Sequence, residues 1–155
     1  MRSRCKPGQS LVEVIVSVGI AVVLAIALIS AGLISNKTAR TARNNTQATK
    51  LAQQYIEQVR VYRDRQGFST LLTKGNGEFC VDSSNADPSL WDLVALPCPI
   101  VTLGGVDFSR SITIADTFPS DSTHKKLVSA TVSWNESGGT QSVTSQTILS
   151  LWSSL

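Results

Sequence analysis

The sequence has 155 residues, a length typical of one domain, with 14 Lys and Arg residues against 11 Asp and Glu residues. Three basic residues, Arg2, Arg4 and Lys6, precede a long apolar run, and the rest of the chain carries 11 charges of each sign. Nucleic-acid binding needs a local excess of Lys and Arg, so no nucleic-acid partner is predicted. No nucleophile elbow, Gly-rich phosphate loop or Cys/His ligand spacing is present, so no catalytic site, cofactor or metal is predicted and the chain is not expected to be an enzyme.

The run from Val14 to Ser35 contains 22 consecutive uncharged residues, most of them apolar. As a helix it would be about 33 Å long at ~1.5 Å per residue, and the hydrocarbon core of a bilayer is ~30 Å thick. We therefore expect one transmembrane helix. Lys and Arg lie close to both of its ends, so the positive-inside rule is nearly balanced. The very short basic tail before the run, and the cysteines in the long part after it, favour a cytoplasmic N-terminus and an exported C-terminal part.

The helix is predicted to begin near Gln9 and to continue beyond the membrane to about Asp64, with Gly67 as its stop. In the second half, apolar residues recur at spacings of three and four, as in a helix that buries one side. This apolar stripe consists of Leu51, Ala52, Tyr55, Ile56, Val59 and Tyr62.

The remainder of the chain is predicted to be irregular at first and then a sheet. Glycines and prolines interrupt residues 68–108, where only short strands near 79–81 and 99–101 are expected. Further on, apolar and polar residues alternate with a period of two, which is typical of strands with one buried face. The expected strands are residues 108–115, 125–134 and 142–152, with a turn at 135–139.

The apolar face of such a sheet needs a cover, and the apolar stripe of the helix is the evident candidate. The predicted fold class is therefore α+β, with a long N-terminal helix packed on a small C-terminal antiparallel sheet.

The segment "KPGQSLVEVIVSVGIAVVLAIALIS", residues 6–30, resembles the N-terminus of type IV pilins and of the pseudopilins of type II secretion. In that family a prepilin peptidase cuts after the glycine that ends a short basic leader, and it usually methylates the new N-terminus. The resemblance implies cleavage after Gly8, N-methylation of Gln9 and an assembly role for Glu13, four residues beyond the new terminus. The sequence departs from the pattern at Gln9, where phenylalanine is most common, and by having no proline within the membrane half of the helix.

The resemblance further implies a minor pilin or pseudopilin that is built into a pilus or pseudopilus. Its partners would be the prepilin peptidase, other pilin or pseudopilin subunits, the inner-membrane assembly platform and membrane lipid. It would be a single-pass protein of the cytoplasmic (inner) membrane, with the C-terminal domain outside. The implied parts are a leader at 1–8, a transmembrane half-helix at 9–35, an amphipathic half-helix at 36–66 and an exported domain at 67–155.

Three cysteines permit three pairings. Cys5 lies in the implied leader, so the expected disulfide joins Cys80 and Cys98, with a stabilisation of about 3 kcal/mol in the chain-entropy model. Reduced thiols are the alternative if the host lacks an oxidising envelope.

Other interpretations remain open. A single-pass anchor with an exported binding domain that does not polymerise is the main alternative. A secreted enzyme behind a signal peptide is a weaker one, with "LISAG" at 28–32 as its cleavage site. His124 is expected to be a solvated residue, and Asp82, Asp87 and Asp92 in one loop are a minor calcium candidate.

Overall fold

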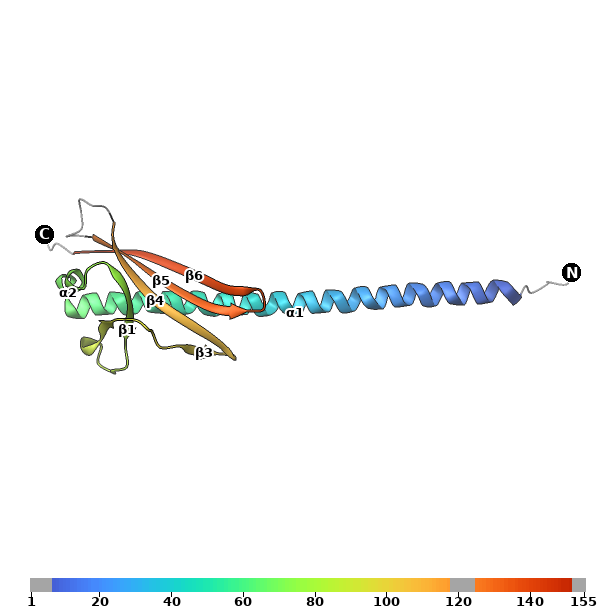
Figure 1. Ribbon diagram of the computed structural model, residues 1–155, viewed down its shortest axis with the longest axis horizontal. Coiled ribbons are helices and arrows are strands. Elements are labelled where there is room, and N and C mark those ends of the chain that lie inside the picture. The colour runs from blue at the N-terminus through green and yellow to red at the C-terminus, as the bar shows by residue number, and fades with distance from the viewer. Residues whose placement is uncertain (1–6, 118–124, 152–155) are drawn as a thin grey trace. The chain divides into compact units, whose positions relative to one another are not determined.

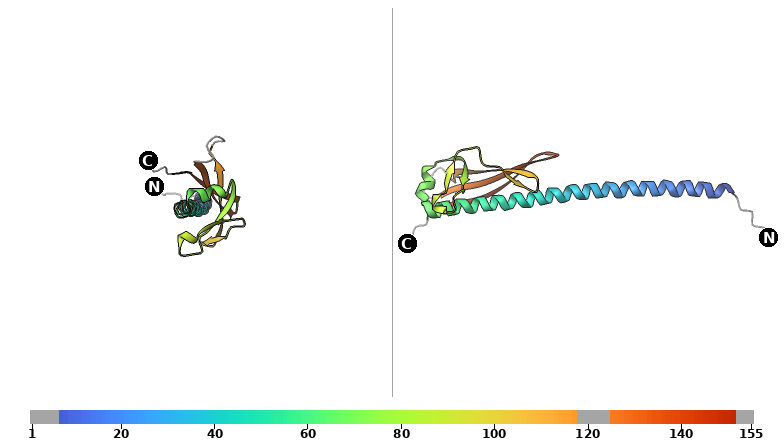
Figure 2. Two further views of the ribbon diagram at one scale, coloured as in Figure 1. Left: turned by 90° about the vertical axis from the view of Figure 1, so that its left-hand side faces the viewer. Right: turned by 90° about the horizontal axis from the view of Figure 1, so that it is seen from below.

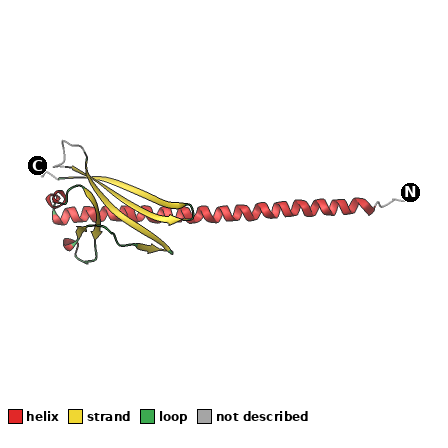
Figure 3. Ribbon diagram, viewed as in Figure 1, coloured by secondary structure: helices red, strands yellow, loops and turns green. Residues whose placement is uncertain are grey.

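The computed structural model describes residues 7–117 and 125–151, with side chains from residue 11 onward. The chain divides into two units, Met1–Arg43 and Asn44–Leu155. Figure 1 shows the elements in chain order, and Figure 3 separates helices from strands. The elements are α1 (Pro7–Gln66), α2 (Phe68–Thr73), β1 (Gly77–Asp82), the 3-10 helix η1 (Pro88–Leu90), β2 (Asp92–Val94), β3 (Val101–Leu103), β4 (Val106–Asp116), β5 (Lys125–Glu136) and β6 (Gly139–Ser150).

In the first unit, α1 exposes apolar side chains all round. Every side chain from Leu11 to Arg40 is exposed, and the large apolar ones are between 52% and 74% exposed. The hydroxyls of Ser17 and Ser30 donate to the carbonyls four residues earlier, at 2.7 and 2.9 Å, so they need no water partner. Among the described residues α1 is the one helix long and apolar enough to cross a membrane, and it can form a single membrane span.

The second unit has its core between the Asn44–Gln66 part of α1 and the sheet. The whole predicted stripe is buried, together with Ala48 one turn before it. The helix ends at Gln66, and Gly67 follows with φ 88°, a conformation that favours glycine. The amide of Gly67 donates to the carbonyl of Arg63 at 2.8 Å and closes the last turn.

The sheet is antiparallel throughout, in the order β2-β1-β4-β5-β6. β5 pairs with one edge of β4. Along the other edge, β3 pairs with the beginning of β4 and β1 pairs with its later part. The three long strands run along one side of the helix in this unit (Figure 2).

The two faces of the long strands differ sharply in composition. The face toward the helix carries eight buried apolar residues. The rings of Phe108 and Trp134, which are paired in register, pack at a tilt of 46° with their centroids 5.7 Å apart. The opposite face carries mostly Ser and Thr, with the hydroxyls of Thr131 and Thr144 3.1 Å apart. The buried apolar residues are Phe108, Ile112, Ile114, Val128, Ala130, Val132, Trp134 and Leu149.

The α+β fold and the three long strands are confirmed, with differences in detail. The turn predicted at 135–139 is tighter, because β5 continues to Glu136 and pairs with Gly139, so that only Ser137 and Gly138 connect the strands. β3 begins at Val101, two residues later than the start of the strand predicted near 99–101. The elements α2, η1 and β2 were not expected, because each is too short to give a periodic pattern.

Candidate functional site

The charged position in the apolar part of α1 is Glu13. Its side chain is exposed, and it is the sole charged residue between Leu11 and Asn36. Ser17 donates to the backbone carbonyl of Glu13, so the carboxylate does not take part in that bond. None of the ion pairs found within the described residues involves Glu13. In an apolar environment such a carboxylate is costly, and a cation supplied from outside this helix would reduce the cost.

Gly8 and Gln9 lie in the first turn of α1, which begins at Pro7, two residues earlier than expected. Proline is compatible with this position because the first helical residues have no intrahelical acceptor for their amides. Gln9 and Glu13 are four residues apart, which places them on one side of the helix with a rise of about 6 Å between them. The basic residues before Pro7, and Cys5 among them, lie outside the described residues.

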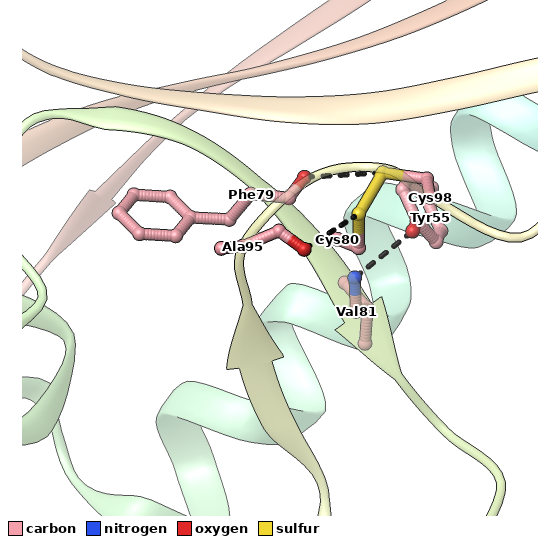
Figure 4. The surroundings of a disulfide bond; sticks show 6 residues. All are labelled: Tyr55, Phe79, Cys80, Val81, Ala95 and Cys98. Carbon is pink, nitrogen blue, oxygen red and sulfur yellow. Dashed lines mark hydrogen bonds between the residues drawn. A yellow bond between two sulfur atoms is a disulfide. The ribbon is translucent and has the colours of Figure 1, made fainter.

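The disulfide predicted between Cys80 and Cys98 is present, with a Cα–Cα distance of 5.2 Å. It ties β1 to the segment that follows β2, and the side chain of Cys80 is buried (Figure 4). The sulfur atoms lie 3.7 and 3.8 Å from the carbonyl oxygens of Ala95 and Phe79. Because disulfide sulfurs carry no hydrogen, these are packing contacts that fix the position of the loop.

Tyr55 connects the disulfide-bonded region to the helix. Its ring is fully buried, and its hydroxyl accepts a hydrogen bond from the amide of Val81 at 2.9 Å (Figure 4). The guanidinium of Arg110, on β4, lies 4.6 Å from the centre of the Tyr55 ring. Stacking of this kind stabilises an arginine that has left bulk water.

An ion pair between a buried lysine and a partly buried aspartate lies at one end of the sheet. Lys126 on β5 is 5% exposed, and its Nζ lies 2.5 Å from Asp116 Oδ1 and 3.0 Å from Asn76 Oδ1. Asn76 in turn donates to Asp116 at 2.7 Å. The hydrogen bonds from Lys126 and Asn76 hold the pKa of Asp116 below its ordinary value. The pair therefore locks the loop before β1 onto β4 and β5.

A second polar cluster joins α2, β2 and α1. Lys74 Nζ lies 2.8 Å from Asp92 Oδ1, which also accepts a hydrogen bond from Tyr62 at 3.3 Å. Burial, together with the charge of Asp92, raises the pKa of Tyr62 to about 12. Partial burial raises the pKa of Asp92, but the hydrogen bonds from Lys74 and from the amide of Leu93 outweigh it, so the net pKa is lowered.

The calcium candidates do not form a metal site. Asp82 and Asp87 accept hydrogen bonds from the backbone amides of Ser84 and Ser89, and Asp92 is paired with Lys74. Across residues 7–117 and 125–151, no group of three or more side chains is arranged to hold a metal ion. His124 lies outside the described residues.

The sequence pattern predicts no role for Arg110 or Lys126, although it carries a signal for both. Arg110 and Lys126 occupy the buried parity of their strands, in line with Phe108 and Val128. A charge at such a position indicates either a paired group or a binding site. Tyr55 and Asn76 come from distant parts of the chain, and Asp116 lies opposite Lys126 only through the register of β4 and β5, so the sequence could not supply these partners.

No protein-family model, curated protein or solved structure matches this chain. The functional conclusions therefore rest on the residues and on the geometry described above.

Proposed function

We propose that the protein is a pilin-like structural subunit, a minor pilin or pseudopilin of a type IV pilus or type II secretion pseudopilus. In this proposal it is inserted in the cytoplasmic membrane as a precursor and cut by the prepilin peptidase between Gly8 and Gln9. The remaining α1 then enters a filament, with the second unit outside the membrane.

The observation that carries the proposal is Glu13, a carboxylate five residues after Gly8 on a helix otherwise uncharged as far as Asn36. A plain anchor gains nothing from this charge. Cleavage would create an ammonium at Gln9, and the amine of one subunit could pair with the carboxylate of a neighbour displaced along the filament axis. In a low dielectric, such pairing selects one axial register over others.

The rest of the molecule supports the same function. A helix with an exposed apolar half and a half that packs on an antiparallel sheet provides a membrane segment and an exported unit on one element. Release from the membrane into a filament would exchange lipid contacts of the apolar half for contacts with other subunit helices. The disulfide is consistent with an exported location.

The first test is the mass and N-terminal sequence of the protein purified from native membranes. A chain that begins at Gln9, methylated or not, supports the proposal. A chain that begins near residues 31–33 would mean signal-peptide cleavage, and an uncut chain in cells with active prepilin peptidase would favour a membrane anchor.

Assembly is tested by Glu13→Gln, which removes the charge and keeps the shape. We expect it to be cleaved and membrane-inserted normally but to be reduced at least tenfold in sheared filament fractions. Ser17→Ala, one turn further on, is the matched control and should assemble as the wild type does, because its hydroxyl contacts only its own helix. Equal incorporation of Glu13→Gln and wild type would refute the assembly role.

A further inference from the structure

Lys126, Asp116 and Asn76 form a closed ring of hydrogen bonds at one end of the sheet. Lys126 Nζ lies 2.5 Å from Asp116 Oδ1 and 3.0 Å from Asn76 Oδ1, while Asn76 Nδ2 lies 2.7 Å from Asp116 Oδ2. Among the described residues, Lys126 is the sole polar or charged residue that is buried. A buried amine therefore lies against a side-chain amide, and one carboxylate contacts the nitrogen atoms of both.

These contacts suit a condensation of the amine with the amide. Because the C=O bond adds ~1.2 Å to the 3.0 Å contact, Cγ of Asn76 is at most about 4.2 Å from Lys126 Nζ. A shift of about 1 Å would bring the two atoms to the attacking distance of ~3–3.5 Å. Asn76 lies between Gly75 and Gly77, and Gly75 has φ 73°, so the backbone here carries few side-chain constraints on such a shift.

Asp116 is placed to move protons from the attacking nitrogen to the departing one. Its Oδ1 faces the nitrogen of Lys126, and its Oδ2 faces the amide nitrogen of Asn76, which would leave. General acid–base catalysis requires a group within hydrogen-bonding distance of each proton that it transfers. Both transfers are therefore within reach of one carboxylate.

We propose that Lys126 and Asn76 condense to an isopeptide bond after the chain has folded. Asp116 takes a proton from the Lys126 ammonium, and the free amine attacks Cγ of Asn76 to form the new C–N bond. The bond from Cγ to Nδ2 then breaks, and the two protons lost by the lysine nitrogen pass one after the other through Asp116 to the departing nitrogen. Ammonium leaves, the carboxylate is regenerated, and no oxidant or reductant is needed. Asn76 is exposed, so the ammonium has a direct path to water.

The reaction is expected to be slow, and the ion pair described above is the state of the freshly folded chain. The hydrogen bonds that hold the pKa of Asp116 below its ordinary value make the protonated carboxyl a minor species. The new bond would join the segment before β1 to the start of β5, across β4 and between residues 50 apart in the sequence. It does not depend on cleavage after Gly8 or on filament assembly.

The test follows the full chain in detergent micelles by mass spectrometry during a week after purification. Samples are reduced and digested with trypsin. We expect residues 75–110 and 126–155 to appear as one linked peptide, lighter by one ammonia than the two separate segments together. Fragmentation should place the link between Asn76 and Lys126. Segments that stay separate throughout the week would overturn the proposal.

Variants at Asp116 test the transfer of protons. Asp116→Asn keeps both reacting groups and removes the proton acceptor, so it should slow the linkage by a factor of about 100 or more. Lys125→Arg, which changes the neighbouring lysine, is the matched control and should link at the wild-type rate. Should Asp116→Asn fail to fold, Asp116→Glu keeps the charge but displaces the carboxylate, and it should slow the linkage severalfold. Linkage of either Asp116 variant at the wild-type rate would contradict the proposed role of the carboxylate.

Loss of ammonia from Asn76 has a competing source, which the same experiment separates. The backbone amide nitrogen of Gly77 can attack Cγ of Asn76 and form a cyclic imide, also with release of ammonia. Lys126→Arg removes the amine and leaves this second route open. We expect Lys126→Arg to lose the linked peptide together with the ammonia deficit. An equal deficit in Lys126→Arg and in wild type would assign the lost ammonia to the imide and overturn the proposal.

Discussion

Between Leu11 and Arg40 every side chain of α1 is exposed, whereas between Ala48 and Tyr62 the same helix buries one whole side. Backbone geometry is shared by the two regions, so the difference lies in the arrangement of apolar residues. In the first region they surround the helix, and only an apolar solvent or other helices can cover them. In the second they form a single stripe, and a sheet of the same chain covers it. The first region of the helix thus suits an apolar environment and the second suits packing on a sheet, because the sequence pattern changes along the helix.

The sharpest way to test this contrast is to make the same substitution in both regions. Ile112→Ala removes a fully buried side chain from the core of the second unit and should lower its free energy of unfolding by about 2–5 kcal/mol. Ile26→Ala removes a side chain that is 59% exposed and should change that free energy by less than about 0.5 kcal/mol.

Tryptophan fluorescence during denaturation in detergent provides the measurement, because all three tryptophans lie in the second unit. A loss of stability in Ile26→Ala similar to that of Ile112→Ala would show that the two regions do not behave as separate units.

The next largest effect concerns the disulfide, which has no counterpart in the first unit. Replacing both Cys80 and Cys98 by Ala should destabilise the second unit by about 3 kcal/mol through the added entropy of the unfolded chain. Helicity of α1 in micelles, followed by far-UV circular dichroism, should remain close to that of wild type. An unchanged denaturation midpoint for the double variant would show that the loop is held by its packing contacts alone.

Patterns within single elements were sufficient to predict most of this architecture. The stripe from Leu51 to Tyr62, the glycine stop at Gly67 and the parity of the long strands each follow from local periodicity, and the structure has all three. The packing of the helix on the sheet follows because the apolar stripe of the helix and the apolar face of the sheet must each be covered.

The polar contacts of the second unit could not be predicted in the same way. Asp116 and Lys126 are directly opposite each other only because of the register between β4 and β5, and Asn76 joins them from 40 residues earlier than Asp116. Arg110 meets Tyr55 only after the sheet has packed on the helix. Such partners depend on tertiary packing, and a single sequence gives their residue types without their pairing.

The smallest expected effect is a loss of stability in acid, and it belongs to the second unit. Asp116 has a folded-state pKa below the ordinary value of 3.8 because Lys126 and Asn76 donate hydrogen bonds to its carboxylate. The unfolded chain therefore binds a proton first as the pH falls, so this contribution is present above about pH 4 and is lost as the pH passes through the folded pKa. Asp116→Asn should be less stable than wild type at pH 7, and the difference should shrink as the pH is lowered toward 2. Denaturation midpoints at several pH values measure this difference, and a gap that stays constant from pH 7 to pH 2 would mean that the Lys126 pair adds no pH-dependent stability.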